Sequence, residues 1–198
     1  LQSKGLLEQY REDLRMRDQT DSTEPTFLAP EDTVDHVIAT AAIQHLDSHL
    51  SDTPFFMWLS FCNPHFPFDP IESIARSYSG TDFPLPVGHD SPPEGYQEHA
   101  RAYAAMVTHL DSCIGVVLDK LRQRRLLDQT LVVFTADHGE MLYDHGLMGK
   151  SYHFDGSARV PFVARLPGVA DPAVIDMPTE ITDTAATFLE IAGDPDLQ

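Results

Sequence analysis

Two long segments of the chain carry apolar residues at three- and four-residue spacing, which is typical of α-helices with one buried face. The first begins at Pro30 and runs over about residues 31–50, with acidic residues in its first turn, where they complement the helix dipole. The second covers residues 98–125 and has cations in its last turns, which are favourable there for the same reason. A shorter final helix is predicted over Thr182–Ala192, with Gly193 as its stop.

Three apolar runs, 54–61, 131–135 and 160–165, are too short for helices and predict strands. The first run is nearly continuous and rich in aromatic residues, which is typical of a strand buried on both faces of an α/β sheet. The second also reads as a buried strand, and Pro161 suits the start or the edge of the third. Residues 69–97 are rich in Pro, Gly, Ser and Asp, so we expect a long loop that shapes a binding cleft.

The alternation of these elements indicates an α/β fold in which helices sandwich a mostly parallel (mixed) sheet. Residues 1–30 are polar and interrupted by prolines, and we expect an irregular lead-in with at most a short helix near residues 6–10. We expect residues 1–198 to form a single, partial domain.

Composition narrows the possible partners. Apolar residues make up 42% of the 198, enough for a core, while 13 Lys+Arg stand against 31 Asp+Glu, a net charge of −18. This charge argues against nucleic acid as a partner and requires any anion site to be a local cluster of metal, Lys and His. Cys62 and Cys113 make no disulfide framework and read as buried structural residues, with a catalytic thiol at Cys62 left open.

The hydropathy and the first residues of the chain bear on whether it has a membrane span or a targeting signal. No apolar run reaches 18 residues, so no membrane span is predicted. The first residues show neither an initiator Met nor a signal pattern, so we expect the sequence to begin within a longer protein, whose localisation stays unknown.

Polar side chains follow two of the predicted strands. Asn63 and His65 come after the first, and Asp137 and His138 come after the second. Since ligands in open α/β sheets bind outside the carboxyl ends of the strands, we expect these residues to face one crevice, which favours an enzyme.

Asp137 and His138 place a carboxylate beside an imidazole, a pair that can coordinate a divalent cation. Gly139 then lets the backbone turn or approach a ligand closely. The alternative is that Asp137 caps a following helix and His138 is a solvated loop residue.

His65 and Lys150 are the candidate catalytic residues. Flanking prolines preset the direction of His65, which could bind an anionic oxygen or protonate a leaving group. Lys150 ends a Gly-bounded loop just after the Asp-His pair and could hold a sulfate or phosphate oxygen as a point charge. An ordinary loop histidine and surface lysine remain the alternative, and His145 and His153 are weaker candidates.

These segments resemble the sulfatase family of the alkaline-phosphatase-like superfamily over roughly residues 32–193. The strongest similarity lies in Leu131–Lys150, L-V-V-F-T-A-D-H-G-E-M-L-Y-D-H-G-L-M-G-K, which looks like the family's strand, metal pair and substrate-binding Lys. The segment P-F-F-M-W-L-S-F-C-N-P-H-F-P-F resembles the one carrying an active-site His. The helix before Leu131 and the later R-V-P-F-V-A-R-L-P-G are also similar.

The resemblance implies that Asp137 and His138 bind a metal, Ca²⁺ first and Mn²⁺ or Zn²⁺ second. His65 and Lys150 would bind the sulfate group and stabilise charge on the leaving oxygen. The family nucleophile is a formylglycine made from Cys or Ser in a Cys-x-Pro/Ala-x-Arg type motif, which this chain lacks. We therefore expect the nucleophile, the other metal ligands and the C-terminal subdomain outside this chain, which by itself should have no turnover.

The expected function of the intact protein is sulfate-ester hydrolysis, on a small-molecule or glycan sulfate ester. One alternative is a phosphonate monoester or phosphodiester hydrolase of the same superfamily. The other is a non-catalytic, metal-binding relative.

Overall fold

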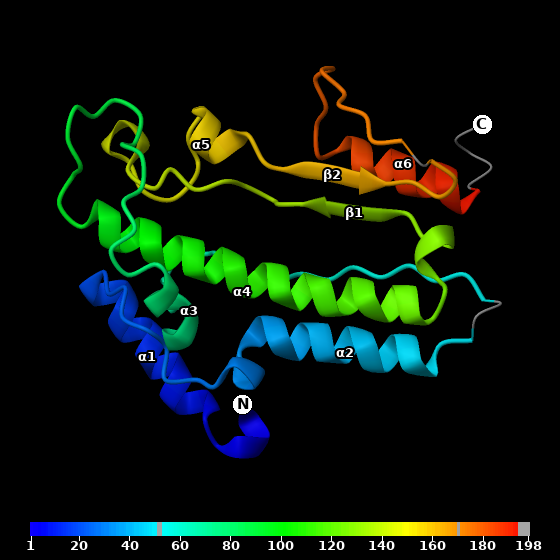
Figure 1. Ribbon diagram of the computed structural model, residues 1–198, viewed down its shortest axis with the longest axis horizontal. Coiled ribbons are helices and arrows are strands. Elements are labelled where there is room, and N and C mark those ends of the chain that lie inside the picture. The colour runs from blue at the N-terminus through cyan, green and yellow to red at the C-terminus, as the bar shows by residue number, and fades with distance from the viewer. Residues whose placement is uncertain (51–52, 170, 194–198) are drawn as a thin grey trace.

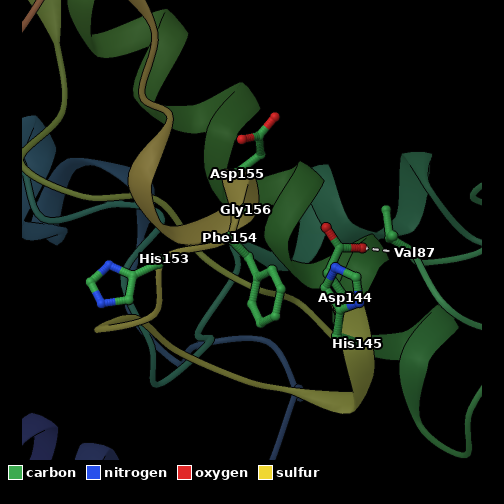
Figure 2. Close-up of a pocket in the computed structure, with 7 residues that line it drawn as sticks. All are labelled: Val87, Asp144, His145, His153, Phe154, Asp155 and Gly156. Carbon is green, nitrogen blue, oxygen red and sulfur yellow. Dashed lines mark hydrogen bonds between the residues drawn. The ribbon is translucent and has the colours of Figure 1, made fainter.

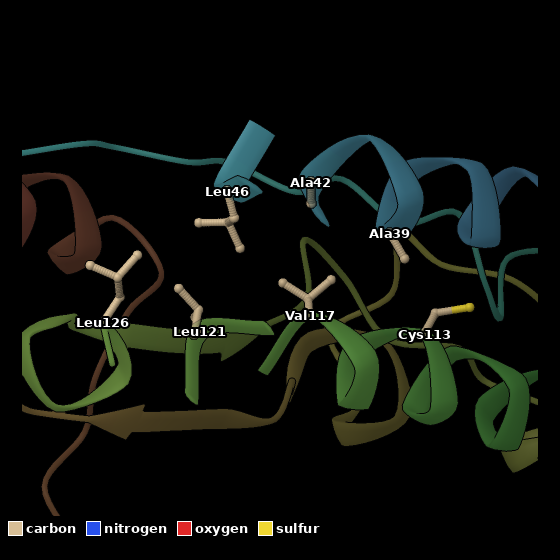
Figure 3. Close-up of a cluster of buried hydrophobic side chains, with 7 residues drawn as sticks. All are labelled: Ala39, Ala42, Leu46, Cys113, Val117, Leu121 and Leu126. Carbon is tan, nitrogen blue, oxygen red and sulfur yellow. The ribbon is translucent and has the colours of Figure 1, made fainter. Parts of the chain in front are cut away.

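Two long helices form the centre of the molecule. The computed structural model describes residues 1–50, 53–169 and 171–193, and in it α2 (Val34–Ser48) packs along α4 (Tyr96–Gln123) (Figure 1). Their facing apolar stripes make the main core, as the helical spacing predicted (Figure 3). The buried side chains of this core are Ala39, Ala42, Leu46, Cys113, Val117, Leu121 and Leu126.

The helix predicted from about residue 31 begins three residues later. Pro30–Asp32 form a 3-10 turn, and Thr33 takes the N-cap position of α2, where its hydroxyl accepts a hydrogen bond from the His36 N–H. A side chain that satisfies a free N–H of the first turn fixes where a helix starts, so the cap decided this boundary.

The lead-in over residues 1–30 was predicted to be irregular, and this was wrong. Leu7–Thr20 form α1, a helix of 14 residues. Its Arg17 is buried, pairs with Asp13 at 2.7 Å and donates to the carbonyl oxygen of Pro25 at 3.0 Å. The helix is weakly amphipathic and is anchored by these polar contacts, which an apolar pattern does not reveal.

The sheet consists of two short strands, β1 (Val132–Thr135) and β2 (Phe162–Arg165). They pair antiparallel, with Val132 opposite Arg165 and Thr135 opposite Phe162. The α/β class therefore stands, but the single ladder among the described residues is not parallel. Both strands are partly or fully exposed, so the prediction of a buried strand at 131–135 was wrong.

The apolar run 54–61 forms no strand ladder with any described residue, contrary to the prediction. Its side chains nevertheless alternate like those of a strand: Phe55, Met57, Leu59 and Phe61 pack against the helical core. Phe56 and Trp58, on the other side, are each 70% exposed. Only one face of the run is covered, because the described chain supplies helices on one side and no layer on the other.

The remaining elements are short. The predicted 69–97 loop contains a helix of its own, α3 (Glu72–Ser77), and a single helical turn, α5 (Asp155–Ala158), precedes β2. The final helix, α6 (Asp183–Ala192), ends at Gly193 in the left-handed conformation, as predicted. Further 3-10 turns cover Gln2–Lys4, Leu127–Gln129 and Asp144–Gly146. No helix in the described parts of the chain has the length and apolarity that crossing a bilayer requires.

Candidate active site

The structure brings all four predicted site residues into one cluster. The Nζ atom of Lys150 lies 2.5 Å from Nε2 of His65, a residue 85 positions away. The His65 and His138 rings meet edge to face, with centroids 5.6 Å apart. The Oδ2 atom of Asp137 lies 3.6 Å from Nε2 of His138. These distances bring the ends of the two apolar runs together.

Both ring nitrogens of His65 have a hydrogen-bond partner. The Lys150 ammonium is a donor only, so Nε2 of His65 accepts from it, while Nδ1 donates to the Phe66 carbonyl oxygen. Both side chains are exposed, so an anionic group arriving from solvent can reach them.

The backbone before His65 is held by an acid that the sequence reading did not identify. Asp35, in the first turn of α2, accepts hydrogen bonds from the N–H groups of Cys62 and Asn63, at 2.7 and 3.2 Å. The Cys62 carbonyl oxygen in turn accepts the N–H of His65 at 3.0 Å. In the sequence, Asp35 is visible only as an acid early in a predicted helix, and the favourable interaction of such an acid with the helix dipole already explains it.

Asp137 and His138 are placed by the close approach of Gly139 to the segment after Lys150. The Gly139 N–H donates to the Ser157 carbonyl oxygen at 2.8 Å, and a Cβ on Gly139 would lie 2.1 Å from the carbonyl oxygen of Gly156. No side chain fits there. His138 donates from Nδ1 to the Gly139 carbonyl oxygen at 2.9 Å, which leaves Nε2 free on the Asp137 side. Asp137 caps no helix, since the next helical turn starts only at Asp144.

Lys150 reaches the cluster because residues 141–149 fold back on themselves. The Met141 N–H donates to the Gly149 carbonyl oxygen at 2.9 Å. Inside the turn, Oε1 of Glu140 accepts from the N–H groups of Leu142 and Gly149, at 3.2 and 2.5 Å. Glu140 thus closes the loop, a role that its position after Asp137-His138-Gly139 did not reveal.

The donors of this cluster fit only part of a metal site. Asp137 offers an 88% exposed carboxylate and His138 an imidazole nitrogen. Within residues 1–50, 53–169 and 171–193, no group of three or more His, Cys, Asp or Glu side chains converges. Ca²⁺ takes six to eight oxygen ligands, whereas imidazole suits Zn²⁺ and related ions better, so the pair can contribute to either kind of site and complete neither.

A catalytic thiol is not favoured at Cys62. The residue is exposed, and the expectation of a buried structural cysteine was wrong here, although it holds for Cys113. Partial desolvation, together with the carboxylates of Asp35 and Asp69, raises the pKa of the Cys62 thiol. A raised pKa lowers the thiolate fraction at neutral pH, and the thiolate is the nucleophilic form.

An open pocket of about 310 Å³ lies at the tip of the 141–149 turn (Figure 2). His145 and Phe154 stack in it with ring centroids 4.2 Å apart. Asp144 and His145 bind the backbone of Val87 at 2.7 Å each, which ties the 69–97 loop to this turn. Its wall adjoins the candidate site, because Gly156 packs on Glu140. The lining residues are Val87, Asp144, His145, His153, Phe154, Asp155 and Gly156.

The weaker candidates His145 and His153 thus line this pocket, while His65 and His138 form the cluster with Lys150. From the 69–97 loop, Val87 lines the pocket.

The fold of the chain is that of an α/β protein of the alkaline-phosphatase-like class. A solved phosphonate monoester hydrolase from Silicibacter pomeroyi superposes with a TM-score of 0.75 at 25% identity, over 85% of this chain and 40% of that one. The family model described as Sulfatase matches residues 7–194. The chain belongs to the sulfatase family.

Curated relatives agree with this assignment. The chain is 41% identical over 100 residues to a choline-sulfatase of Rhizobium meliloti, covering 50% of this chain and 19% of the relative. It is 31% identical over 163 residues to an arylsulfatase of Clostridium perfringens, covering 70% and 34% respectively. The chain therefore spans about a third or less of the length of these relatives.

Proposed function

We propose that the protein containing this chain hydrolyses sulfate esters. The observation that carries the proposal is the convergence of Lys150, His65 and His138 beyond the end of β1 and of the 54–61 run. A lysine beside a histidine is suited to a sulfate ester that must first be bound and then lose an alkoxide. The names of the choline-sulfatase and arylsulfatase relatives support this chemistry.

Each residue has a distinct role in this proposal. The Lys150 ammonium binds a sulfate oxygen as a point charge and holds a proton beside Nε2 of His65. When the ester bond breaks, the leaving oxygen takes a proton from the Lys150 ammonium, directly or relayed through Nε2 of His65, and solvent then reprotonates Lys150. The free Nε2 of His138 and the carboxylate of Asp137 face the same cluster and are the proposed metal ligands.

Two further groups would complete the chemistry. A metal ion would add positive charge at Asp137 and His138; Ca²⁺ is proposed from the family resemblance, with Mn²⁺ or Zn²⁺ as alternatives. The further ligands of this metal are proposed to lie outside residues 1–198. A formylglycine, also outside this chain, would supply the nucleophile.

The test compares full-length protein with Lys150→Ala and His65→Ala variants on an aryl sulfate. We expect each variant to lose about 10²- to 10³-fold in kcat/KM, the usual cost of removing one such charge-stabilising or proton-transferring group. Wild-type activity equal to that of the double variant would refute the proposal. The matched control is Lys4→Ala. It also removes a lysine, but one that pairs with Asp32 and is distant in sequence from Lys150, so kcat/KM should stay unchanged.

The second candidate is a phosphonate monoester or phosphodiester hydrolase, favoured by the superposition on the phosphonate monoester hydrolase. Paired aryl sulfate and aryl phosphonate substrates with the same leaving group separate the two, because only the transferred group differs. A complete protein that binds metal and hydrolyses neither substrate would instead be a non-catalytic relative.

We propose a small-molecule or glycan sulfate ester as the substrate, with its alcohol part directed toward the pocket at His145 and Phe154. Pockets for small ligands begin at about 300 Å³, so this one has room for a small alcohol. Its lining from the 69–97 loop makes that loop the proposed source of substrate selectivity.

A further inference from the structure

Asp35 carries a buried carboxylate that the proposed chemistry does not use. The residue is 2% exposed, and among the described residues no Lys, Arg or His forms an ion pair with it. Burying a carboxylate without a counter-charge costs several kcal/mol, roughly, unless hydrogen bonds replace its hydration. The contacts that offset this cost therefore show what the carboxylate does.

Those contacts run to another segment of the chain. Thr33 already caps α2, so the helix does not need Asp35 for its free N–H groups. Both carboxylate oxygens are directed to the backbone 27 and 28 positions away, Oδ1 to the Cys62 N–H and Oδ2 to the Asn63 N–H. Charge-assisted hydrogen bonds to two successive amides fix the orientation of that backbone.

The fixed backbone leads directly to His65. The His65 N–H is bonded to the Cys62 carbonyl oxygen, while its exposed side chain contacts Lys150, the Phe66 carbonyl oxygen and the ring of His138. A shift of the backbone at Cys62 and Asn63 would therefore carry the exposed imidazole with it.

We propose that Asp35 is a positioning residue for sulfate-ester hydrolysis. Its carboxylate holds the amides of Cys62 and Asn63 and so sets where Nε2 of His65 meets Lys150. This inference rests on the proposed function, and it adds a residue of α2 to those that place His65.

The test uses full-length protein with Asp35→Asn, in which an NH₂ group replaces one acceptor oxygen, and Asp47→Asn as control. Asp47 lies on the same helix but is exposed and bound to Lys120. We expect Asp35→Asn to lower kcat per folded molecule by about 10- to 100-fold, the scale of a misplacement near 1 Å, with KM little changed. Asp47→Asn should match wild type.

A double-mutant cycle separates positioning from general stability. If Asp35 acts through His65, then Asp35→Asn should cause no further loss of kcat in a His65→Ala background. An equal loss in both backgrounds, or wild-type kcat per folded molecule in Asp35→Asn, overturns the proposal. Should Asp35→Asn fail to fold, Asp35→Glu keeps the charge while shifting the carboxylate by one methylene and serves in the same cycle.

A readout without turnover keeps the two proposals distinguishable. NMR of ¹⁵N-histidine-labelled protein should show the ring signals of His65 moving in Asp35→Asn and staying in place in Asp47→Asn. Unmoved His65 signals overturn the positioning role whatever the activity. Wild-type protein without sulfate-ester turnover, but with the expected NMR change, would refute the proposed function and leave the role of Asp35 intact.

Discussion

At the scale of single residues, the candidate site depends on backbone groups that approach closely. His138 is held because Gly139 touches the backbone of Gly156 and Ser157, and His65 is held because Asp35 binds the amides before it. Chemically capable side chains therefore owe their positions to neighbours with no role in the chemistry.

Gly139→Ala is predicted to disrupt this arrangement. The added Cβ would meet the Gly156 carbonyl oxygen at 2.1 Å, so the backbone beside His138 must shift. We expect a loss of about 1–3 kcal/mol in the free energy of unfolding, measured by urea denaturation, and a fall in kcat.

The matched control is Gly115→Ala, in the middle of α4, where nothing lies within 4 Å of the new Cβ. Alanine is the better helix former, so this variant should gain about 0.5–1 kcal/mol. Similar effects of the two changes would mean that the close approach at Gly139 does not matter.

At the scale of elements, α1 is joined to the segment after His65 by a half-buried polar contact. Tyr10 donates its hydroxyl to Asp69 at 2.7 Å. Burial raises the pKa of Asp69 to about 6, against the opposing effects of the Tyr10 hydrogen bond and the Arg17 charge. Burial therefore favours the protonated form of Asp69, whereas the hydrogen bond from Tyr10 favours the ionised form.

This raised pKa predicts a pH-dependent stability. A carboxyl with a pKa raised in the folded state binds more protons there than in the unfolded state, so its contribution is fully present below pH about 4 and is lost as pH rises through about 6. Asp69→Asn, which does not titrate, should reduce the loss of stability between pH 4 and pH 7 in urea denaturation. Asp82→Asn, at an exposed position, should leave the pH profile as in wild type.

At the scale of the whole molecule, the layer on one side of the run 54–61 is missing among the described residues. Phe56 and Trp58 are exposed, and Phe56 has an aromatic contact with Phe188 of α6 at 5.7 Å. An apolar face of this kind is normally covered by another layer of structure.

Trp58, the one tryptophan in the sequence, makes this exposure measurable. In the isolated 198-residue chain its fluorescence should be red-shifted and readily quenched by acrylamide, since the side chain is 70% exposed. In the full-length protein we expect a protected signal from this residue, read after replacement of any other tryptophans. A protected Trp58 in a chain shown to be monomeric by light scattering would contradict the structure.

The sequence by itself determined the helices α2, α4 and α6 and the positions of β1 and β2, and it predicted the four residues of the candidate site. These features depend on local periodicity, on the stop at Gly193, and on polar residues placed where apolar runs end, all of which neighbouring residues encode. The tertiary structure alone decided the rest. The length of α1 depends on the contacts of Arg17. The run 54–61 is covered on one face because of the layers that pack against it. Asp35 and Glu140 bind backbone amides, in the first case distant in sequence and in the second across a turn. Hydrogen bonds between distant segments leave no periodic trace in a sequence, because either partner alone looks like an ordinary polar residue.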